Sequence, residues 1–440
     1  MFDRNHLRQR LRSVGLYTAV LAKWTLLSVV VGGLCGAVGA VFHLSVHYAS
    51  ETREAYPWLL WCLPLAGLMI VGAYKLMGTE GLGTNDIIDA VHEDKRIPFL
   101  LLPSIFLGTL LTHLCGGSAG REGAALQIGG TLGQRVGRFL RLDDQDLRVA
   151  TLSGMAACFS ALFGTPLTAV IFAVMGISVG TLYHAALLPC LMSALAAFGV
   201  SLALGVEPTR FSVAAPEIAV GTFVRVLPLA VLFALVSILF CTFIHAAEHW
   251  MQRRFPNPWV RVALGGFAVI ALTYLAGTRD YNGAGMEVIA AAVEQGTARP
   301  AAFLLKLLFT AVTLAAGFKG GEVVPSFFVG ATFGCAAAPL LGLPAGFGAA
   351  LGLVSVFCGV TNSPVASVFL SVELFGSQGL WYFALACGVS YMLSGYSGLY
   401  SSQTILYSKL KASYINVHAN SRPAAPEQGT PEGPETAKHT

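Results

Sequence analysis

An arginine and a glutamate stand between two glycines in a strongly apolar part of the chain. Arg121 and Glu122 are flanked by Gly120 and Gly123, and the residues from Ile97 to Gly120 include no Asp, Glu, Lys or Arg. A charge at membrane depth costs ~2.5–3.5 kcal/mol on insertion scales, so such charges are rare and usually functional. The carboxylate of Glu122 could fill an anion site while ionised and leave it once protonated. Glu122 is therefore a candidate gate and proton carrier.

The glycines around this pair predict a broken helix rather than a continuous one. Glycine destabilises a helix interior by about 1 kcal/mol relative to alanine. We expect the free backbone N–H groups at the break to point into the membrane at an anion, with Gly120, Arg121 and Gly123 as the anion-binding residues. An ion pair between Arg121 and Glu122 is the alternative, which is weakened because adjacent residues of a helix do not face each other.

A glycine-rich element 40 residues earlier (122 − 82 = 40) offers more backbone donors. It reads Gly81-Leu82-Gly83-Thr84-Asn85-Asp86. A loop of this kind that enters a helix leaves amides free for an anion. The candidate anion-binding residues are Leu82, Gly83, Thr84 and Asn85. The alternative is a surface turn before an amphipathic helix.

A third element places a second carboxylate in a similar setting. It reads Lys319-Gly320-Gly321-Glu322-Val323-Val324-Pro325. We expect Glu322 to take part in gating or proton transfer, and Gly321, Val323 and Val324 to contribute to anion binding. The alternative is that Glu322 pairs with Lys319 at the membrane surface.

Tyr400 follows the last apolar run, within the sequence Gly398-Leu399-Tyr400-Ser401-Ser402. A tyrosine hydroxyl is a neutral hydrogen-bond donor, which suits an anion. Tyr400 is therefore a further candidate anion-binding residue. A tyrosine that anchors the chain at the membrane–water interface is the alternative.

Two serine motifs raise the alternative of an intramembrane hydrolase. Residues 116–120 fit the G-x-S-x-G pattern, and residues 395–398 fit the G-x-S-G pattern of intramembrane serine proteases. The second pattern needs a histidine on a later helix, and only His418 and His439 follow it. We therefore expect that the chain is not an enzyme.

The remaining metal-binding residue types are scattered. The nine cysteines stand singly, without the spacing of metal ligands, so they are expected to be core residues. Isolated histidines such as His43, His47 and His113 are typical of packed or interfacial positions. We expect neither a metal site nor a cofactor.

The composition predicts an all-α polytopic membrane protein. Hydrophobic residues make up 55% of the 440 residues and charged residues 11%, against ~25% charged in soluble domains. Crossing the bilayer takes ~20 apolar residues, and the charge-free run 149–206 must hold at least two segments. We expect well over ten helices, several of them tilted or broken. The net charge of +4 is too small to suggest nucleic acid as a partner.

Two motifs recur at nearly the same offset, which predicts two related halves. Gly120 corresponds to Gly321 (321 − 120 = 201), and Pro166 corresponds to Pro364 (364 − 166 = 198). Such repeats are typical of transporters whose site lies at the repeat interface. We expect halves at 21–207 and 208–412, preceded by a cytoplasmic segment 1–20 with four arginines. Residues 413–440 are expected to form a disordered polar tail.

These elements, in this order, resemble the CLC family of anion channels and proton-coupled anion exchangers over about residues 20–410. The resemblance implies two inverted halves of tilted and broken helices, and a homodimer with one pore in each subunit. It also implies that Glu122 is the gating glutamate and that Tyr400 is the tyrosine donor at the central anion site.

The departures from chloride-transporting members are similar to the fluoride-exporting branch of this family. Leu82 stands where chloride members carry a serine, and Thr84-Asn85 replaces Ile-Pro. Glu322 precedes a valine where those members carry phenylalanine, and residues 172–176 lack the inner glutamate of chloride/proton exchangers. Val324 stands where the fluoride branch is expected to carry threonine.

The resemblance therefore implies a fluoride/proton antiporter of the bacterial inner membrane that confers fluoride resistance. Its partners would be fluoride, protons, the lipid bilayer and a second copy of the chain. A chloride/proton exchanger or a chloride channel is the alternative, with chloride as a possible substrate, and an intramembrane hydrolase is a distant one.

Overall fold

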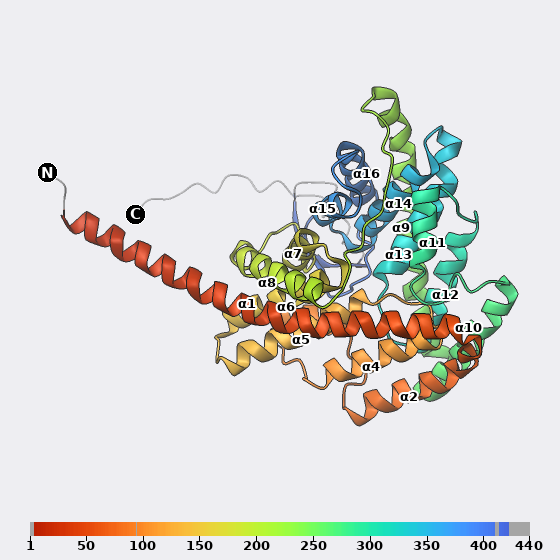
Figure 1. Ribbon diagram of the computed structural model, residues 1–440, viewed down its shortest axis with the longest axis horizontal. Helices are drawn as coiled ribbons and strands as arrows, with labels where there is room; N and C mark the ends of the chain where they lie inside the picture. The colour runs from red at the N-terminus through yellow and green to blue at the C-terminus, as the bar shows by residue number, and fades with distance from the viewer. Residues whose placement is uncertain (1–3, 94, 410–412, 422–440) are drawn as a thin grey trace, which may run out of the picture.

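A computed structural model describes residues 4–93, 95–409 and 413–421 (Figure 1). Within these residues the chain forms sixteen α-helices. Their bounds are α1 (Arg4–Ala55), α2 (Leu63–Leu76), α3 (Thr84–His92), α4 (Leu101–Leu114), α5 (Glu122–Phe139), α6 (Asp144–Phe163), α7 (Pro166–Met175), α8 (His184–Ala203), α9 (Val220–Arg254), α10 (Pro258–Ala276), α11 (Met286–Ala290), α12 (Ala302–Ala316), α13 (Val323–Ala337), α14 (Ala345–Thr361), α15 (Pro364–Phe375) and α16 (Leu380–Leu393). Short 3-10 turns occupy Pro57–Cys62 and Ala338–Leu341, and a π-helical turn occupies Ala291–Gln295.

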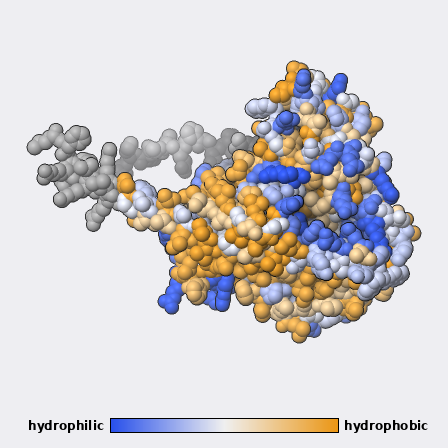
Figure 2. Space-filling view, in the orientation of Figure 1, coloured by the Kyte–Doolittle hydropathy of each residue, from blue (hydrophilic) through white to orange (hydrophobic). Residues whose placement is uncertain are grey.

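Helix lengths confirm an all-α polytopic membrane fold with interrupted helices. Seven helical segments of the described chain are long and apolar enough to cross a membrane, and six shorter apolar helices have 10–17 residues. Large apolar side chains cover much of the surface seen in Figure 2. Leu26, Leu235, Phe267 and Trp381 each have more than half of their area exposed.

The helix breaks arise from the same local chemistry in both halves. Helix α6 ends at Phe163 because Gly164 takes a left-handed φ of +67°, and Pro166 begins α7. Helix α14 likewise ends where Asn362 takes a φ of +54°, and Pro364 begins α15. A left-handed residue terminates a helix, and proline is favoured in the first turn of the next one.

Close glycine contacts hold equivalent helix pairs together in the two halves. A Cβ on Gly129 of α5 would lie 2.2 Å from the carbonyl oxygen of Gly154 in α6. A Cβ on Gly330 of α13 would lie 2.2 Å from the carbonyl oxygen of Gly352 in α14. Glycine at these positions lets the helix backbones touch. The α5/α6 pair and the α13/α14 pair have the same contact geometry, as expected of a structural repeat.

A small sheet joins distant parts of the chain and corrects one prediction. Strand β2 (Thr404–Tyr407) lies between β1 (Ser178–Val179), with which it is parallel, and β3 (Tyr414–His418), with which it is antiparallel. The expected disordered tail 413–440 is therefore wrong for residues 414–418, which pair with β2. Residues 422–440 lie outside the described part of the chain. The expected boundary at 207/208 falls in the irregular segment between α8 and α9.

Candidate functional site

The centre of the molecule is a direct backbone link between the two glycine-rich breaks. Gly120 N–H donates to the carbonyl oxygen of Gly321 at 2.7 Å, and Gly321 N–H donates to that of Gly120 at 2.8 Å. A Cβ on Gly321 would lie 2.6 Å from the backbone nitrogen of Gly123, so only glycine allows this approach. Helices α5 and α13 begin immediately after the paired glycines, which brings their N-termini to one place.

Glu122 occupies this meeting point and is fully buried. Its Oε2 accepts hydrogen bonds from the N–H of Arg121 at 3.0 Å and from the N–H of Val324 at 3.3 Å. Its Oε1 has no hydrogen-bond partner among the described residues. The carboxylate thus sits where the N-terminus of α13 offers its amides to a negative charge. No ion pair between Arg121 and Glu122 is found in the described part of the chain.

Glu322 lies directly before α13 and is partly buried. Its backbone carbonyl accepts from Ser326 N–H at 3.0 Å. The described residues contain no ion pair between Glu322 and Lys319, whose ammonium lies 4.3 Å from the ring centre of Tyr74. The carboxylate is therefore available for other interactions.

The element that contains Thr84 packs against the start of α5. Thr84 Oγ1 lies 3.5 Å from the carbonyl oxygen of Gly123, and Gln127 Nε2 donates to Thr84 Oγ1 at 3.1 Å. Asn85 Oδ1 accepts from the N–H of Ser402 at 3.3 Å. These contacts tie the first element to both the α5 terminus and the segment after Tyr400.

Two residues of that element differ from their expected role. The N–H of Gly83, expected to be free for an anion, donates to Asp86 Oδ2 at 2.8 Å. This is half of a capping box, in which the acid one turn into α3 satisfies the amide before it. The N–H of Leu82 donates to the carbonyl oxygen of Thr79 at 3.2 Å, and its side chain is partly buried and packs against the apolar core.

Tyr400 belongs to the interior rather than to a surface belt. It is 3% exposed, and its hydroxyl has no hydrogen-bond partner among the described residues. Its ring centre lies 6.5 Å from that of Phe172. A free hydroxyl at such a place can donate to an anion in the pathway.

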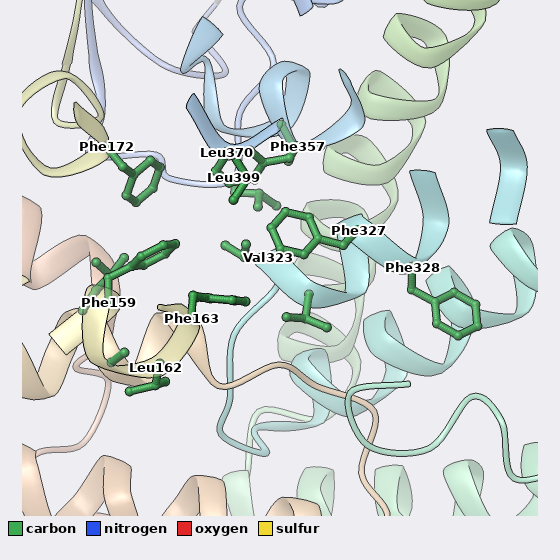
Figure 3. Close-up of a cluster of buried hydrophobic side chains, with 14 of the residues drawn as sticks. Phe159, Leu162, Phe163, Phe172, Val323, Phe327, Phe328, Phe357, Leu370 and Leu399 are labelled. Atoms are coloured by element: carbon green, nitrogen blue, oxygen red, sulfur yellow. The ribbon is translucent and has the colours of Figure 1, made fainter. Parts of the chain in front are cut away.

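Five phenylalanines form a closed ring of contacts that the sequence analysis did not identify. Neighbouring ring centres lie between 5.0 and 6.1 Å apart. The ring runs through Phe159, Phe163, Phe327, Phe357 and Phe172. Figure 3 shows Val323 and Leu399 among these side chains. Aromatic edges carry partial positive charge, so the ring can exclude water while it tolerates a small anion.

Cavities approach the site near both ends of α2. The larger, of about 960 Å³, is lined by Pro57, just before α2, and by Arg121. Another, of about 380 Å³, is lined by Tyr74, near the end of α2, and by Lys319. Arg121 and Lys319 each stand next to one of the two breaks.

Known proteins share the family and the fold of this chain. The voltage-gated chloride channel family matches residues 66–395. A chloride/fluoride channel protein of Pseudomonas syringae pv. tomato is 37% identical over 398 residues, which cover 88% of each chain. The crystal structure of a CLC-type fluoride/proton antiporter has a TM-score of 0.84 and 36% identity, and the match covers 88% of this chain and 98% of that one.

Chloride-transporting relatives are more distant. An H(+)/Cl(-) exchange transporter ClcA of Salmonella arizonae is 27% identical, and the match covers 93% of this chain and 92% of that one. The crystal structure of a slow cyanobacterial Cl-/H+ antiporter shares the fold, with a TM-score of 0.73 and 18% identity.

Proposed function

The chain belongs to the voltage-gated chloride channel (CLC) family, and on this premise we propose that it exports fluoride in exchange for protons. The observation that carries the proposal is the carboxylate of Glu122, which accepts the N–H of Val324 where an anion would bind. Support for fluoride comes from two relatives of more than 30% identity, a chloride/fluoride channel protein and a fluoride/proton antiporter.

The exchange follows from competition for the N-terminus of α13. Ionised Glu122 holds the Val324 amide and keeps an anion out. Protonation removes the negative charge and weakens that hydrogen bond, because bonds to charged groups are about twice as strong as neutral ones. The neutral carboxyl then leaves, and an anion takes its place beside Val324 and the free hydroxyl of Tyr400. When Glu122 gives up its proton and returns, it displaces the anion.

Glu322 supplies a second carboxyl on this route. Its protonated form can donate a hydrogen bond to a small anion, whereas its ionised form repels one. Residues 172–176, at the C-terminal end of α7, contain no acid. Glu322 therefore transfers the protons in place of an acid in that segment. Anion passage past Glu322 then requires a proton, as exchange demands.

The surroundings favour fluoride over chloride. Fluoride is small and strongly hydrated, so its site must replace water with close, strong donors. The phenylalanine ring excludes water. Leu82 has no hydroxyl, whereas chloride-transporting members carry a serine at this position. A tenfold preference needs only about 1.4 kcal/mol, which one hydrogen bond to a charged group supplies.

We also propose the assembly and location of the protein. The exposed apolar side chains support contact with the lipid bilayer, and the bacterial relatives support the inner membrane. Four arginines near the N-terminus support its cytoplasmic orientation. The fold supports a homodimer with one pathway in each subunit. Helices α7, α8, α15 and α16 expose large apolar residues that a partner could cover, including Leu167, Leu188, Leu195, Val365 and Trp381.

Anion efflux from liposomes tests the function. Purified protein is reconstituted, and fluoride efflux, chloride efflux and proton uptake are recorded together. Fluoride should leave faster than chloride, and protons should enter with it. Faster chloride than fluoride efflux would replace the proposal with a chloride-type member, and fluoride efflux without proton movement would make it a channel.

A further inference from the structure

Several nitrogen-bearing side chains line the larger cavity, and the exchange route does not use them as ligands. Arg53 of α1, His113 of α4 and Arg121 all line it. His113 is fully buried, and the Arg53 side chain is 13% exposed. Both side chains are therefore largely shielded from bulk solvent.

Two nitrogen atoms of this group lack a partner. Among the described residues, neither Arg53 Nη1 nor His113 Nε2 has a hydrogen bond. Arg53 uses only Nη2 for its ion pair, donating to Glu54 Oε1 at 3.0 Å. A buried polar atom without a partner costs about 1–3 kcal/mol, so both atoms call for a ligand inside the cavity.

The hydrogen bond at Nδ1 of His113 determines whether Nε2 is a donor or an acceptor. Nδ1 lies 2.9 Å from the carbonyl oxygen of Thr109. A carbonyl oxygen only accepts, so Nδ1 carries the hydrogen. In the neutral ring Nε2 is then an acceptor, and it becomes a donor only when the ring takes up a second proton. His113 can therefore hold an anion only in its protonated form.

The local charge favours an anion. The Arg53 and Arg121 side chains line the same cavity as His113, and each carries a positively charged guanidinium. Lys306 is satisfied by the carbonyl oxygens of Gly283 and Tyr281 at 2.6 and 3.2 Å, so it offers no free donor.

Carboxylates also line the cavity, and two of them are well exposed. Their side chains are 61% exposed at Glu51 and 57% exposed at Glu54. Water and salt screen charges at such positions. The cavity is lined by five acidic residues in all, Glu51, Glu54, Glu207, Asp280 and Glu287.

We propose that the part of this cavity lined by Arg53, His113 and Arg121 is a pH-dependent binding site for one small monovalent anion. Arg53 Nη1, protonated His113 Nε2 and the Arg121 guanidinium hold the anion. Anion and proton bind together, because Nε2 donates only after protonation. The site lies outside the Glu122–Val324 contact, and its occupancy does not depend on which anion the protein transports.

Bromide soaks of crystals of the full-length protein locate the site, since bromide is identified by its anomalous scattering. Soaks over a concentration series at about pH 5.5 and about pH 7.5 compare a larger with a smaller protonated fraction of the imidazole. Bromide should appear beside His113 Nε2 and Arg53 Nη1, with apparent affinity at least about tenfold higher at the lower pH. No bromide at this position at low pH, or equal affinity at both pH values, would overturn the proposal.

Substitutions at His113 separate a ligand from a packing residue. His113→Gln places an amide donor near Nε2 that needs no proton, so bromide should bind equally well at both pH values. His113→Phe should abolish binding at this position. His47→Gln is the matched control, because His47 lines the same cavity but pairs with Glu51, and it should behave as wild type. If His113→Phe does not fold, a wild-type pH response in His113→Gln still refutes the assignment.

Discussion

Oε2 of Glu122 accepts a hydrogen bond from the backbone N–H of Val324, 202 residues further along the chain. The paired bonds between Gly120 and Gly321 hold the two breaks in register beside it. Glu122, from the first half of the chain, is thereby held at the N-terminus of α13 in the second half. A change in the charge of one carboxylate therefore alters a contact between the halves, which is the property that coupled transport requires.

Replacing Glu122 by glutamine should end proton coupling. Glutamine keeps the shape of the side chain but cannot ionise, so it neither carries a proton nor competes as an anion for the Val324 amide. Proton uptake into liposomes should stop, and fluoride flux should become uncoupled or collapse. Glu51→Gln, at an exposed position in the cavity, serves as the control. Normal pH-driven fluoride pumping by Glu122→Gln would remove this residue from the mechanism.

Two substitutions at Glu322 should have graded effects. Glu322→Gln retains a hydrogen-bond donor but cannot transfer a proton, so fluoride preference should partly survive while proton coupling is impaired. Glu322→Ala should lose both. The measurement is the ratio of fluoride to chloride efflux together with proton uptake, with the exposed Glu217→Gln as the control. Wild-type behaviour in both variants would show that Glu322 has no part in transport.

Much of this site could be predicted from the local glycine and proline pattern and from the repeat in the sequence. The offset of 201 residues between Gly120 and Gly321 predicted related halves, and the structure pairs these two glycines directly. Glycine and proline act on the backbone of their own segment, so the breaks before α5 and α13 could be read from sequence. The burial of Glu122 likewise follows from its apolar surroundings.

Features that depend on distant partners could not be predicted in this way. The phenylalanine ring joins residues of α6, α7, α13 and α14, and the sequence carries no signal that these rings meet. Strand β3 exists because β2 offers it a hydrogen-bonded edge, although it falls within the segment 413–440 that was predicted to be a polar tail. The amide of Gly83 is engaged because the α3 turn brings Asp86 back to it.

Alanine at Gly330 should weaken the packing of α13 on α14. The added Cβ would lie 2.2 Å from the carbonyl oxygen of Gly352, so the helices must separate. Overpacking of this kind costs about 1–3 kcal/mol. Gly388→Ala is the control, because a Cβ there meets no atom within 4 Å and alanine is the better helix former. Thermal unfolding in detergent should show a lower midpoint for Gly330→Ala only, and equal midpoints would contradict the close packing.

Phenylalanine at Tyr400 should weaken anion binding without weakening the fold. The hydroxyl has no partner among the described residues, so removing it breaks no bond within the protein. If it donates to the bound anion, its loss should cost ~1.5–3 kcal/mol, or roughly 10- to 100-fold in the Kd for fluoride.

Tyr382→Phe provides the opposite control. The Tyr382 hydroxyl donates to the carbonyl oxygen of Glu217 at 2.7 Å and accepts from the N–H of Ala219 at 3.0 Å. Its removal should lower the free energy of unfolding and leave fluoride affinity unchanged. Calorimetric titration and thermal unfolding of both variants separate the two roles. An unchanged fluoride Kd in Tyr400→Phe would mean that Tyr400 only packs against the phenylalanine ring, and that the Val324 amide binds the anion without it.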